Sequence, residues 1–276
     1  AGAAPDEPSC HAALTYWADH ALPTGRDELV SRRGQWIAVG TEYIDTVGVC
    51  LSNFSAAPQV ITAWLVPVDH IWDYRVDPGV TLANTTLTIP VGSCQWIYWN
   101  VSAAVRPGSY VRLDLSANPQ VAWHAASRLV PGHVAAFDMG GNRMRRYGSG
   151  LTMSHRISPA QPVFGPANVI SGVTRPHRRT NLWRSAPDLK LPQWVQLDWP
   201  EAKTIRLVEL TFPGHLIREY HAYGPLYRDP QTPRDYQIYI WDGAAWREIM
   251  SVTGNYQRHR RHVLREAVTK NKLRVV

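Results

Sequence analysis

Apolar and polar side chains alternate in two segments of the last third of the chain, Trp194–Trp199 and Tyr236–Trp241. A period of two places successive side chains on opposite faces and is typical of a half-buried β-strand. Asp242 and Gly243 follow the second segment, and this pair favours the positive φ angles of a type I′ turn. We therefore predict a hairpin in which Tyr236–Trp241 pairs with Trp246–Ser251. No segment here repeats apolar residues with the long period of a helix.

The first half of the chain contains a series of strand patterns separated by proline, glycine and asparagine. The clearest are Val47–Ser52, Val60–Val66, Thr85–Ile89, Gln95–Val101 and Tyr110–Leu115. Within the last of these, the apolar side chains face one way, while Arg112 and Asp114 face the other. Regularly spaced strands of this kind predict a β-sandwich between Trp36 and Ser127.

Three further segments set the domain organisation. Ser9–Leu22 is predicted as a short helix with Ser9 as its N-cap. Met139–Gly150 mixes glycine with arginine and fits an exposed connecting loop, and the proline-rich Ile157–Pro166 follows it. With a boundary near residue 155, these signals give an N-terminal extension or short helix at 1–30, a β-sandwich domain at 31–155 and a second domain at 156–276.

The segments of the second domain follow one another in a distinctive order. They are Asn168–Gly172, Asn181–Ser185, Pro192–Asp198, Ile205–Leu210, Arg234–Trp241 and Trp246–Ile249. This order resembles the discoidin-like (coagulation factor 5/8 type C) galactose-binding fold, a β-jelly-roll used for binding. The resemblance covers Phe164–Val276. Together with the strands of the first half, it implies an all-β chain of two β-sandwich domains, the second a discoidin-like jelly roll. The resemblance also favours binding over catalysis.

A β-sandwich followed by Gly165–Pro176, Asn181–Trp183 and Gly254–Arg258 also resembles the C-terminal region of large bacterial FAD-dependent oxidoreductases. In those proteins a flavin domain precedes the two sandwiches. No Gly-x-Gly-x-x-Gly follows a strand in this sequence, so we expect no flavin or other cofactor here. The chain starts without methionine and stops within the predicted strand Lys272–Val276. We therefore expect a fragment of a larger bacterial enzyme, whose catalytic domain would be its partner.

Composition narrows the class of protein. At 276 residues with 45% hydrophobic content, the chain can form the cores of two domains. It contains no run of about 18 apolar residues, so no membrane span is expected. The net charge of +7 and the pI of about 9.5 favour polyanionic partners. Most of the excess charge lies in Arg175–Arg179 and Arg258–His262.

The three cysteines are too few for a disulfide framework. Cys50 and Cys94 both fall in predicted strands, where they would either form a disulfide or remain buried, unreactive thiols. The compartment is therefore not fixed by the sequence, although an extracellular or periplasmic location is favoured over others.

The strongest candidates for catalysis are three aspartates, Asp69, Asp73 and Asp77, which surround Trp72 and Tyr74. A glycosidase needs two carboxyl groups on either side of a cleft, which sequence alone does not establish. We expect the fragment not to be an enzyme. The alternative is a stand-alone β-sandwich carbohydrate-active enzyme, a lyase or a glycosidase.

Other chemistry has less support. Asp198 and Glu209 occupy outward-facing strand positions, and Ser149 lacks the strand–turn–helix context of a nucleophilic serine. His259 and His262 are three apart in a predicted strand, so they face opposite sides. Ser171 stands where discoidin-like domains usually carry an acidic calcium ligand, and no Cys-x-x-Cys motif is present. We expect no metal site.

Basic and aromatic residues in two predicted loops give the best binding signal. Jelly-roll modules present ligands to loops at one end, where aromatic faces stack on sugars and arginine bonds hydroxyls or carboxylates. The candidate ligand-binding residues are Arg175, His177, Arg178, Arg179, Asn181, Tyr220, Tyr223, Tyr227, Arg228 and Arg258. The alternatives are a solvated charged rim or an interface with the missing catalytic domain.

These observations together predict a non-catalytic accessory pair of β-sandwiches that binds carbohydrate or docks a neighbouring domain. The expected ligand is a glycan or an acidic polysaccharide. Nucleic acid ranks below this, because the arginines lie in loops and the strand aromatics are mixed with apolar neighbours.

Overall fold

The computed structural model describes residues 8–11, 23–77, 79–127, 130, 133–148, 150–174, 181–186, 189–213 and 232–276. These residues form sixteen β-strands and one 3₁₀ helix, which confirms the all-β class. Two compact units are present. The sandwich unit contains the described residues between Thr15 and Val163, and the C-terminal unit contains those before Thr15 and after Val163. No helix in the described parts of the chain is long and apolar enough to cross a membrane.

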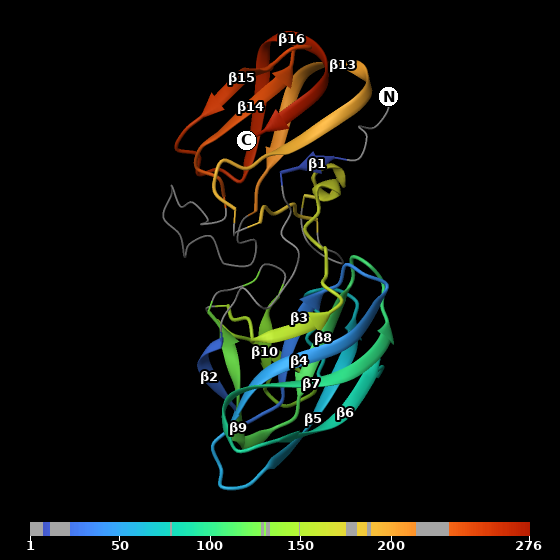
Figure 1. Cartoon of the computed structure of the whole chain (residues 1–276), viewed down its shortest axis with the longest axis vertical. Helices are drawn as coiled ribbons and strands as arrows, with labels where there is room; N and C mark the ends of the chain where they lie inside the picture. Colours follow the sequence, from blue (N-terminus) through green and yellow to red (C-terminus); the bar gives the residue numbers. More distant parts are fainter. Residues whose placement is uncertain are drawn as a thin grey trace. The chain divides into compact units, whose positions relative to one another are not determined.

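The sandwich unit consists of two antiparallel sheets (Figure 1). Its strands are β2 (Pro23–Leu29), β3 (Arg33–Ala38), β4 (Tyr43–Asn53), β5 (Gln59–Val68), β6 (Ala83–Ile89), β7 (Gly92–Ala104), β8 (Tyr110–Leu115), β9 (Asn118–Ala126), β10 (Ala135–Asp138), β11 (Met144–Arg146) and β12 (His155–Ser158). One sheet has the order β11-β10-β3-β8-β5-β6. The other has the order β12-β4-β9-β2, with β7 paired to β4. All five strands predicted in this region are confirmed.

The core of the sandwich unit follows from the alternation in its strands. In β4, Val47, Val49 and Leu51 are fully buried in the main hydrophobic cluster, and Leu113 of β8 belongs to the same cluster. Trp123 of β9 is also fully buried there, and its indole N–H donates to the Ser154 carbonyl oxygen at 2.8 Å. Burying one such aliphatic side chain stabilises the folded state by about 1.5–3 kcal/mol. The residues of β4 with the opposite parity, Cys50 among them, therefore lie on the face of the sheet away from this core.

The C-terminal unit is a five-stranded antiparallel sheet in the order β1-β13-β16-β14-β15. Its elements are β1 (Ser9–Cys10), η1 (Pro166–Ile170), β13 (Val195–Thr211), β14 (Tyr236–Trp241), β15 (Trp246–Val252) and β16 (His259–Val275). The β13–β16 ribbon has register shifts between Asp198 and Lys203 and between Ile205 and Leu207. Such bulges bend a ribbon, and Figure 1 shows both long strands curving.

This bend encloses a second hydrophobic core. Val208 of β13 lies in one cluster with Tyr236 and Ile238 of β14 and Leu273 of β16. The hydroxyl of Tyr236 lies 2.8 Å from Nε2 of His262, on the opposite half of β16 from Leu273. The two halves of the curved sheet therefore pack on each other around Tyr236.

Two local predictions are corrected. The hairpin of β14 and β15 is confirmed, but its loop spans residues 242–245: Gly243 has a φ of 111°, whereas Asp242 is not in the positive-φ region that a type I′ turn needs. Instead, the Asp242 carboxylate accepts the backbone N–H groups of Ala244 and Ala245 at 2.9 and 2.8 Å. Ser9 is not a helix N-cap, because it lies in β1 opposite Gln196. Residues 12–22 lie outside the described residues.

The segment predicted as a connecting loop is part of the sandwich. Asp138 pairs with Met144 in the β10–β11 hairpin, and Met144 is buried. Gly140, Gly141 and Asn142 all adopt positive φ angles, of 85°, 67° and 59°, which reverses the chain at the hairpin tip. The sandwich unit also extends beyond the predicted boundary at residue 155, because β12 pairs with β4.

Candidate functional site

The predicted ligand loops lie largely outside the described part of the chain. This applies to Arg175, His177, Arg178, Arg179, Tyr220, Tyr223, Tyr227 and Arg228. Of the predicted set, the structure places Asn181 and Arg258. Nδ2 of Asn181 donates to the Val173 carbonyl oxygen at 2.5 Å, and Arg258 donates to the carbonyl oxygen of Thr174. Both side chains therefore fasten the backbone that leads into residue 175.

A cleft of about 590 Å³ opens in the sandwich unit between the loop after β5 and the tip of the β10–β11 hairpin. Its lining includes Asp69, Trp72, Asp73, Tyr74, Arg75 and Asn142. Trp72 and Tyr74 are half-buried, whereas Asp69 and Asn142 are exposed. The cleft thus combines aromatic surface with acidic, basic and amide groups that are within reach of solvent.

The hairpin tip holds the loop along one side. Asn142 accepts the backbone N–H of Val76 through its carbonyl at 3.2 Å and that of Asp77 through its side-chain oxygen at 2.8 Å. The Met144 N–H donates to the Tyr74 carbonyl oxygen at 2.8 Å. These bonds run alongside the bridge between Arg75 and Arg143. The glycine-rich turn therefore positions one wall of the cleft.

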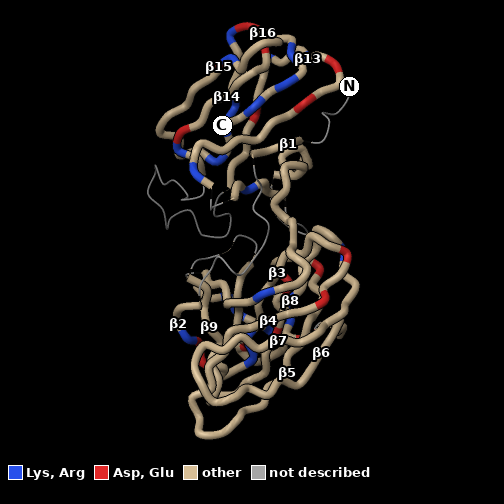
Figure 2. Tube along the Cα trace, viewed as in Figure 1, with Lys and Arg blue, Asp and Glu red and all other residues tan. Residues whose placement is uncertain are grey.

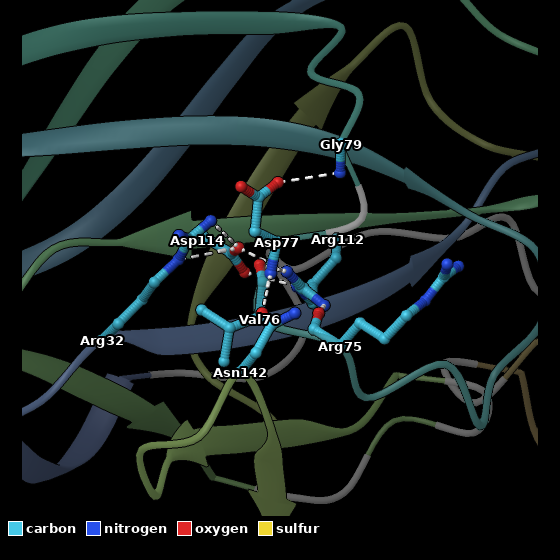
Figure 3. Close-up of polar contacts among 8 residues, drawn as sticks. All are labelled: Arg32, Arg75, Val76, Asp77, Gly79, Arg112, Asp114 and Asn142. Atoms are coloured by element: carbon cyan, nitrogen blue, oxygen red, sulfur yellow. Dashed lines mark hydrogen bonds and ion pairs between the residues drawn. The ribbon is translucent and has the colours of Figure 1, made fainter.

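A buried ionic network supports the same loop from below (Figure 3). Arg112 and Asp114 of β8 are both fully buried and form a bidentate pair, with distances of 2.7 and 2.8 Å. Nη1 and Nη2 of Arg112 donate to the carbonyl oxygens of Arg75 and Val76 at 2.5 and 2.7 Å. Nη2 of Arg32 lies 2.6 Å from Asp114. Buried charges are retained when they are paired and fully bonded, and here that pairing fixes the loop that forms the cleft.

The carboxylates in the cleft are paired with a cation. Arg75 binds Asp73 through Nε and Nη2, at 2.8 and 2.5 Å, and lies 3.5 Å from Asp69. The hydrogen bond from Arg75 lowers the pKa of Asp73, so this carboxyl is ionised at neutral pH. Acid catalysis of glycoside cleavage requires a carboxyl group whose pKa is raised. The environment of Asp73 favours hydrogen bonding to a ligand over proton transfer.

Asp198, Glu209, His259 and His262 lie on the C-terminal sheet. Asp198 is 3.3 Å from Lys272 and Glu209 is 2.6 Å from Arg261, both at the surface of the C-terminal sheet. Figure 2 shows charged residues distributed along β13 and β16. His259 is exposed and His262 is buried against Tyr236, so these two histidines do not converge.

Sequence reasoning identified Asp69, Asp73 and Trp72 as a cluster but missed the residues that shape their cleft. Alternation placed Arg112 and Asp114 on one face of a strand, and it contained no signal that another segment covers that face. Asn142 was missed because its contribution depends on the hairpin turn.

No family model matches the chain. No curated protein matches it either. Among solved structures, the family 32 carbohydrate-binding module of Streptococcus pneumoniae EndoD is 18% identical and gives a TM-score of 0.32, covering 41% of this chain and 70% of that chain. Allantoicase from Saccharomyces cerevisiae is 12% identical at a TM-score of 0.29, over 92% of this chain and 76% of that chain. A fucolectin from Morone saxatilis (striped bass) serum is 9% identical and gives a TM-score of 0.26, covering 97% of this chain and 89% of that chain. The fold assignment rests on the sheets and cores described above.

Proposed function

We propose that this chain is a non-catalytic accessory pair of β domains that binds carbohydrate through the cleft of its sandwich unit. The observation that carries the proposal is the supported cleft itself, in which half-buried Trp72 lies among ionised and amide side chains. Sugar rings present apolar C–H faces that pack on aromatic rings, and hydroxyl groups that bond to carboxylate, guanidinium and amide groups. Ligand sites of this kind are usually formed before the ligand arrives.

The pairing of Asp73 with Arg75 suits hydroxyl recognition. The carboxylate of Asp73 keeps oxygen lone pairs and the guanidinium of Arg75 keeps N–H groups beyond the ion pair, and both residues line the cleft. Vicinal hydroxyls of a sugar both donate and accept hydrogen bonds, so they can engage both partners at once. Arg143 adds a second positive charge to the same lining, which favours acidic sugars.

Two sequence segments remain a second proposed contact, for acidic glycans. They are the arginine-rich segment 175–181 and the tyrosine-rich segment 220–228. Charge-based binding there would be salt-sensitive, because exposed charges are screened beyond about 8 Å at physiological ionic strength. The C-terminal unit is proposed to be a discoidin-like jelly roll, on the order of its sequence segments.

The parent protein is proposed to be a bacterial FAD-dependent oxidoreductase, with its catalytic domain as a partner of this chain. The support is the succession of the sandwich, Gly165–Pro176 and Gly254–Arg258. The full open reading frame tests this directly. An upstream Gly-x-Gly-x-x-Gly between a strand and a helix is expected, and a reading frame without a flavin domain would contradict the parentage.

One observation favours a second function, a carbohydrate-active enzyme. Asp69 and Asp73 share the cleft, as a lyase or a glycosidase would require. Turnover of an oligosaccharide by the purified chain, abolished by Asp73→Asn, would establish this alternative and overturn the non-catalytic proposal.

The binding proposal is tested by a glycan array followed by calorimetric titration of the best ligand. We expect wild-type binding and a marked loss in Trp72→Ala. Tyr43→Ala is the matched control, because Tyr43 is half exposed on β4 and is not part of the cleft lining. Equal binding by Trp72→Ala and Tyr43→Ala would place the ligand elsewhere.

A further inference from the structure

Two cysteines and one histidine from three neighbouring strands meet on the sheet that contains β4. Sγ of Cys50 lies 2.8 Å from Sγ of Cys94, and both sulfurs and a ring nitrogen of His124 lie within 4.8 Å of one another. The strand register explains this meeting: Leu51 of β4 pairs with Trp123 of β9 on one side and with Gln95 of β7 on the other. Neither cysteine is in a disulfide.

His124 is held with one nitrogen directed at this cluster. Its Nδ1 lies 3.3 Å from the carbonyl oxygen of Thr24, and a carbonyl only accepts, so Nδ1 carries the proton. Nε2 is then a bare acceptor, and it lies 2.7 Å from the hydroxyl of Ser52. The same hydroxyl oxygen accepts the backbone N–H of Cys94 at 2.9 Å. Histidines that ligate metals are commonly fixed in this way by a carbonyl on the other nitrogen.

Cys94 has an uncommon backbone conformation for a residue other than glycine. It has a φ of 48° at an irregularity in the β4–β7 pairing, and it is exposed, whereas Cys50 is fully buried. Non-glycine residues rarely adopt this backbone conformation, and those that do cluster at functional sites. The left-handed backbone brings the Cys94 sulfur to Cys50 while leaving one side of the cluster open.

We propose that Cys50, Cys94 and His124 form a binding site for a thiophilic d¹⁰ cation, with Zn²⁺ as the defining ion. Two thiolates and one imidazole are a donor set that zinc favours, and the two thiolates neutralise its charge. The exposed side of Cys94 leaves the fourth tetrahedral position to water. Zn–S bonds of about 2.3 Å place two sulfurs roughly 3.8 Å apart, so binding requires the exposed Cys94 sulfur to move outward by about 1 Å.

One cation near the cluster, Arg156, is held by aromatic side chains. Arg156 lies with its guanidinium 4.1 Å from the ring of Trp96 and donates to the hydroxyl of Tyr98 at 2.5 Å. Trp96 and Tyr98 follow Cys94 along β7. The charge of Arg156 lowers the pKa of Cys50, but burial raises that pKa more, so the Cys50 thiol keeps its proton until a metal ion displaces it.

The test is a Zn²⁺ titration of the reduced, chelator-treated full chain in competition with a chromophoric chelator. We expect one equivalent of Zn²⁺ to bind with release of protons. Co²⁺ in place of Zn²⁺ should give a thiolate-to-cobalt charge-transfer band. Cys94→Ser and His124→Gln should each weaken Zn²⁺ binding by at least about a hundredfold, whereas Cys10→Ser, the matched control on β1, should bind as wild type.

Melting curves distinguish a variant that has lost zinc binding from one that has lost its fold. Cys94 is exposed, so Cys94→Ser should melt at the wild-type temperature without zinc, and added Zn²⁺ should raise the melting temperature of wild type and Cys10→Ser only. Zinc binding that is equal in Cys94→Ser and wild type would overturn the proposal. So would a Cys50–Cys94 disulfide, seen as the loss of two hydrogens in mass, that forms from the reduced chain with glutathione disulfide even when Zn²⁺ is present. That result would mean that Cys50 and Cys94 form a structural disulfide and do not bind a metal ion.

Discussion

The two units of this chain treat charged residues in opposite ways. In the sandwich unit, β5, β6 and β7 contain no charged side chain, and the pair Arg112–Asp114 is fully buried beneath the cleft (Figures 2 and 3). In the C-terminal unit, charges follow β13 and β16 along the surface, in pairs such as Glu209–Arg261. The buried charged pair of the sandwich unit holds the loop that forms the cleft. The charged pairs of the C-terminal unit lie on the surface of its sheet, in contact with water. The two kinds of pair should therefore respond very differently to mutation.

The largest loss in the free energy of unfolding is expected for Asp114→Ala. Removing this carboxylate leaves Arg112 buried without its partner, and breaking a buried pair typically costs about 3–5 kcal/mol. Amide resonances of the sandwich unit, followed through urea unfolding, measure this loss without mixing in the C-terminal unit. A change below about 1 kcal/mol would mean that the network contributes nothing beyond a surface pair.

A smaller effect is expected from acid. His133 and His155 are fully buried and stack with ring centroids 5.6 Å apart. Burial lowers the pKa of His155 to about 4, and burial together with the charge of His155 lowers the pKa of His133 well below its ordinary value of 6.5. The unfolded chain therefore takes up protons that the folded sandwich unit excludes. Stability is complete above about pH 6.5 and falls as the pH drops towards 4, by at most about 1.4 kcal/mol per pH unit for each histidine.

This pH dependence is measured by urea unfolding between pH 7 and pH 4. His155→Gln should unfold with a shallower loss of stability over that range, because one of the two groups no longer titrates. An identical slope in wild type and variant would show that His155 does not contribute to the acid sensitivity.

The smallest loss in the free energy of unfolding is expected for Glu209→Gln. Glu209 and Arg261 are both about half exposed, and pairs of this kind typically contribute about 0.2–1 kcal/mol. Urea unfolding followed through resonances of the C-terminal unit, at low and at high salt, gives the value. A loss of stability above about 2 kcal/mol in Glu209→Gln would show that this exposed pair contributes about as much as a buried one, which contradicts the difference drawn between the two units.

Sequence reasoning worked where a local period decides the structure. The strands around Val49, Leu113 and Ile238 were predicted because one face of each must be buried. The same period could not show that the polar face of Tyr110–Leu115 is also covered, since that depends on the loop after β5 and on the β10–β11 hairpin. Gly140 and Gly141 looked like linker residues, but they make the turn that forms one wall of the cleft.

The cluster of Cys50, Cys94 and His124 shows most clearly what the sequence pattern could not predict. These residues are far apart in the chain, and no spacing motif links them. Their meeting depends on the register of β4 with both of its neighbours and on the left-handed backbone at Cys94. Cys94 was predicted either to pair with Cys50 or to remain a buried, unreactive thiol. The structure shows it as an exposed residue.

The most direct test of the proposed function is calorimetric titration of one neutral and one acidic oligosaccharide into wild type, Trp72→Ala and the double variant Arg178→Ala/Arg179→Ala. If the cleft is the sugar site, Trp72→Ala should weaken both ligands by at least about tenfold, the equivalent of about 1.4 kcal/mol. The double arginine variant should weaken only the acidic ligand, and less so at high salt. Unchanged affinity of Trp72→Ala for both ligands would contradict the assignment of the cleft.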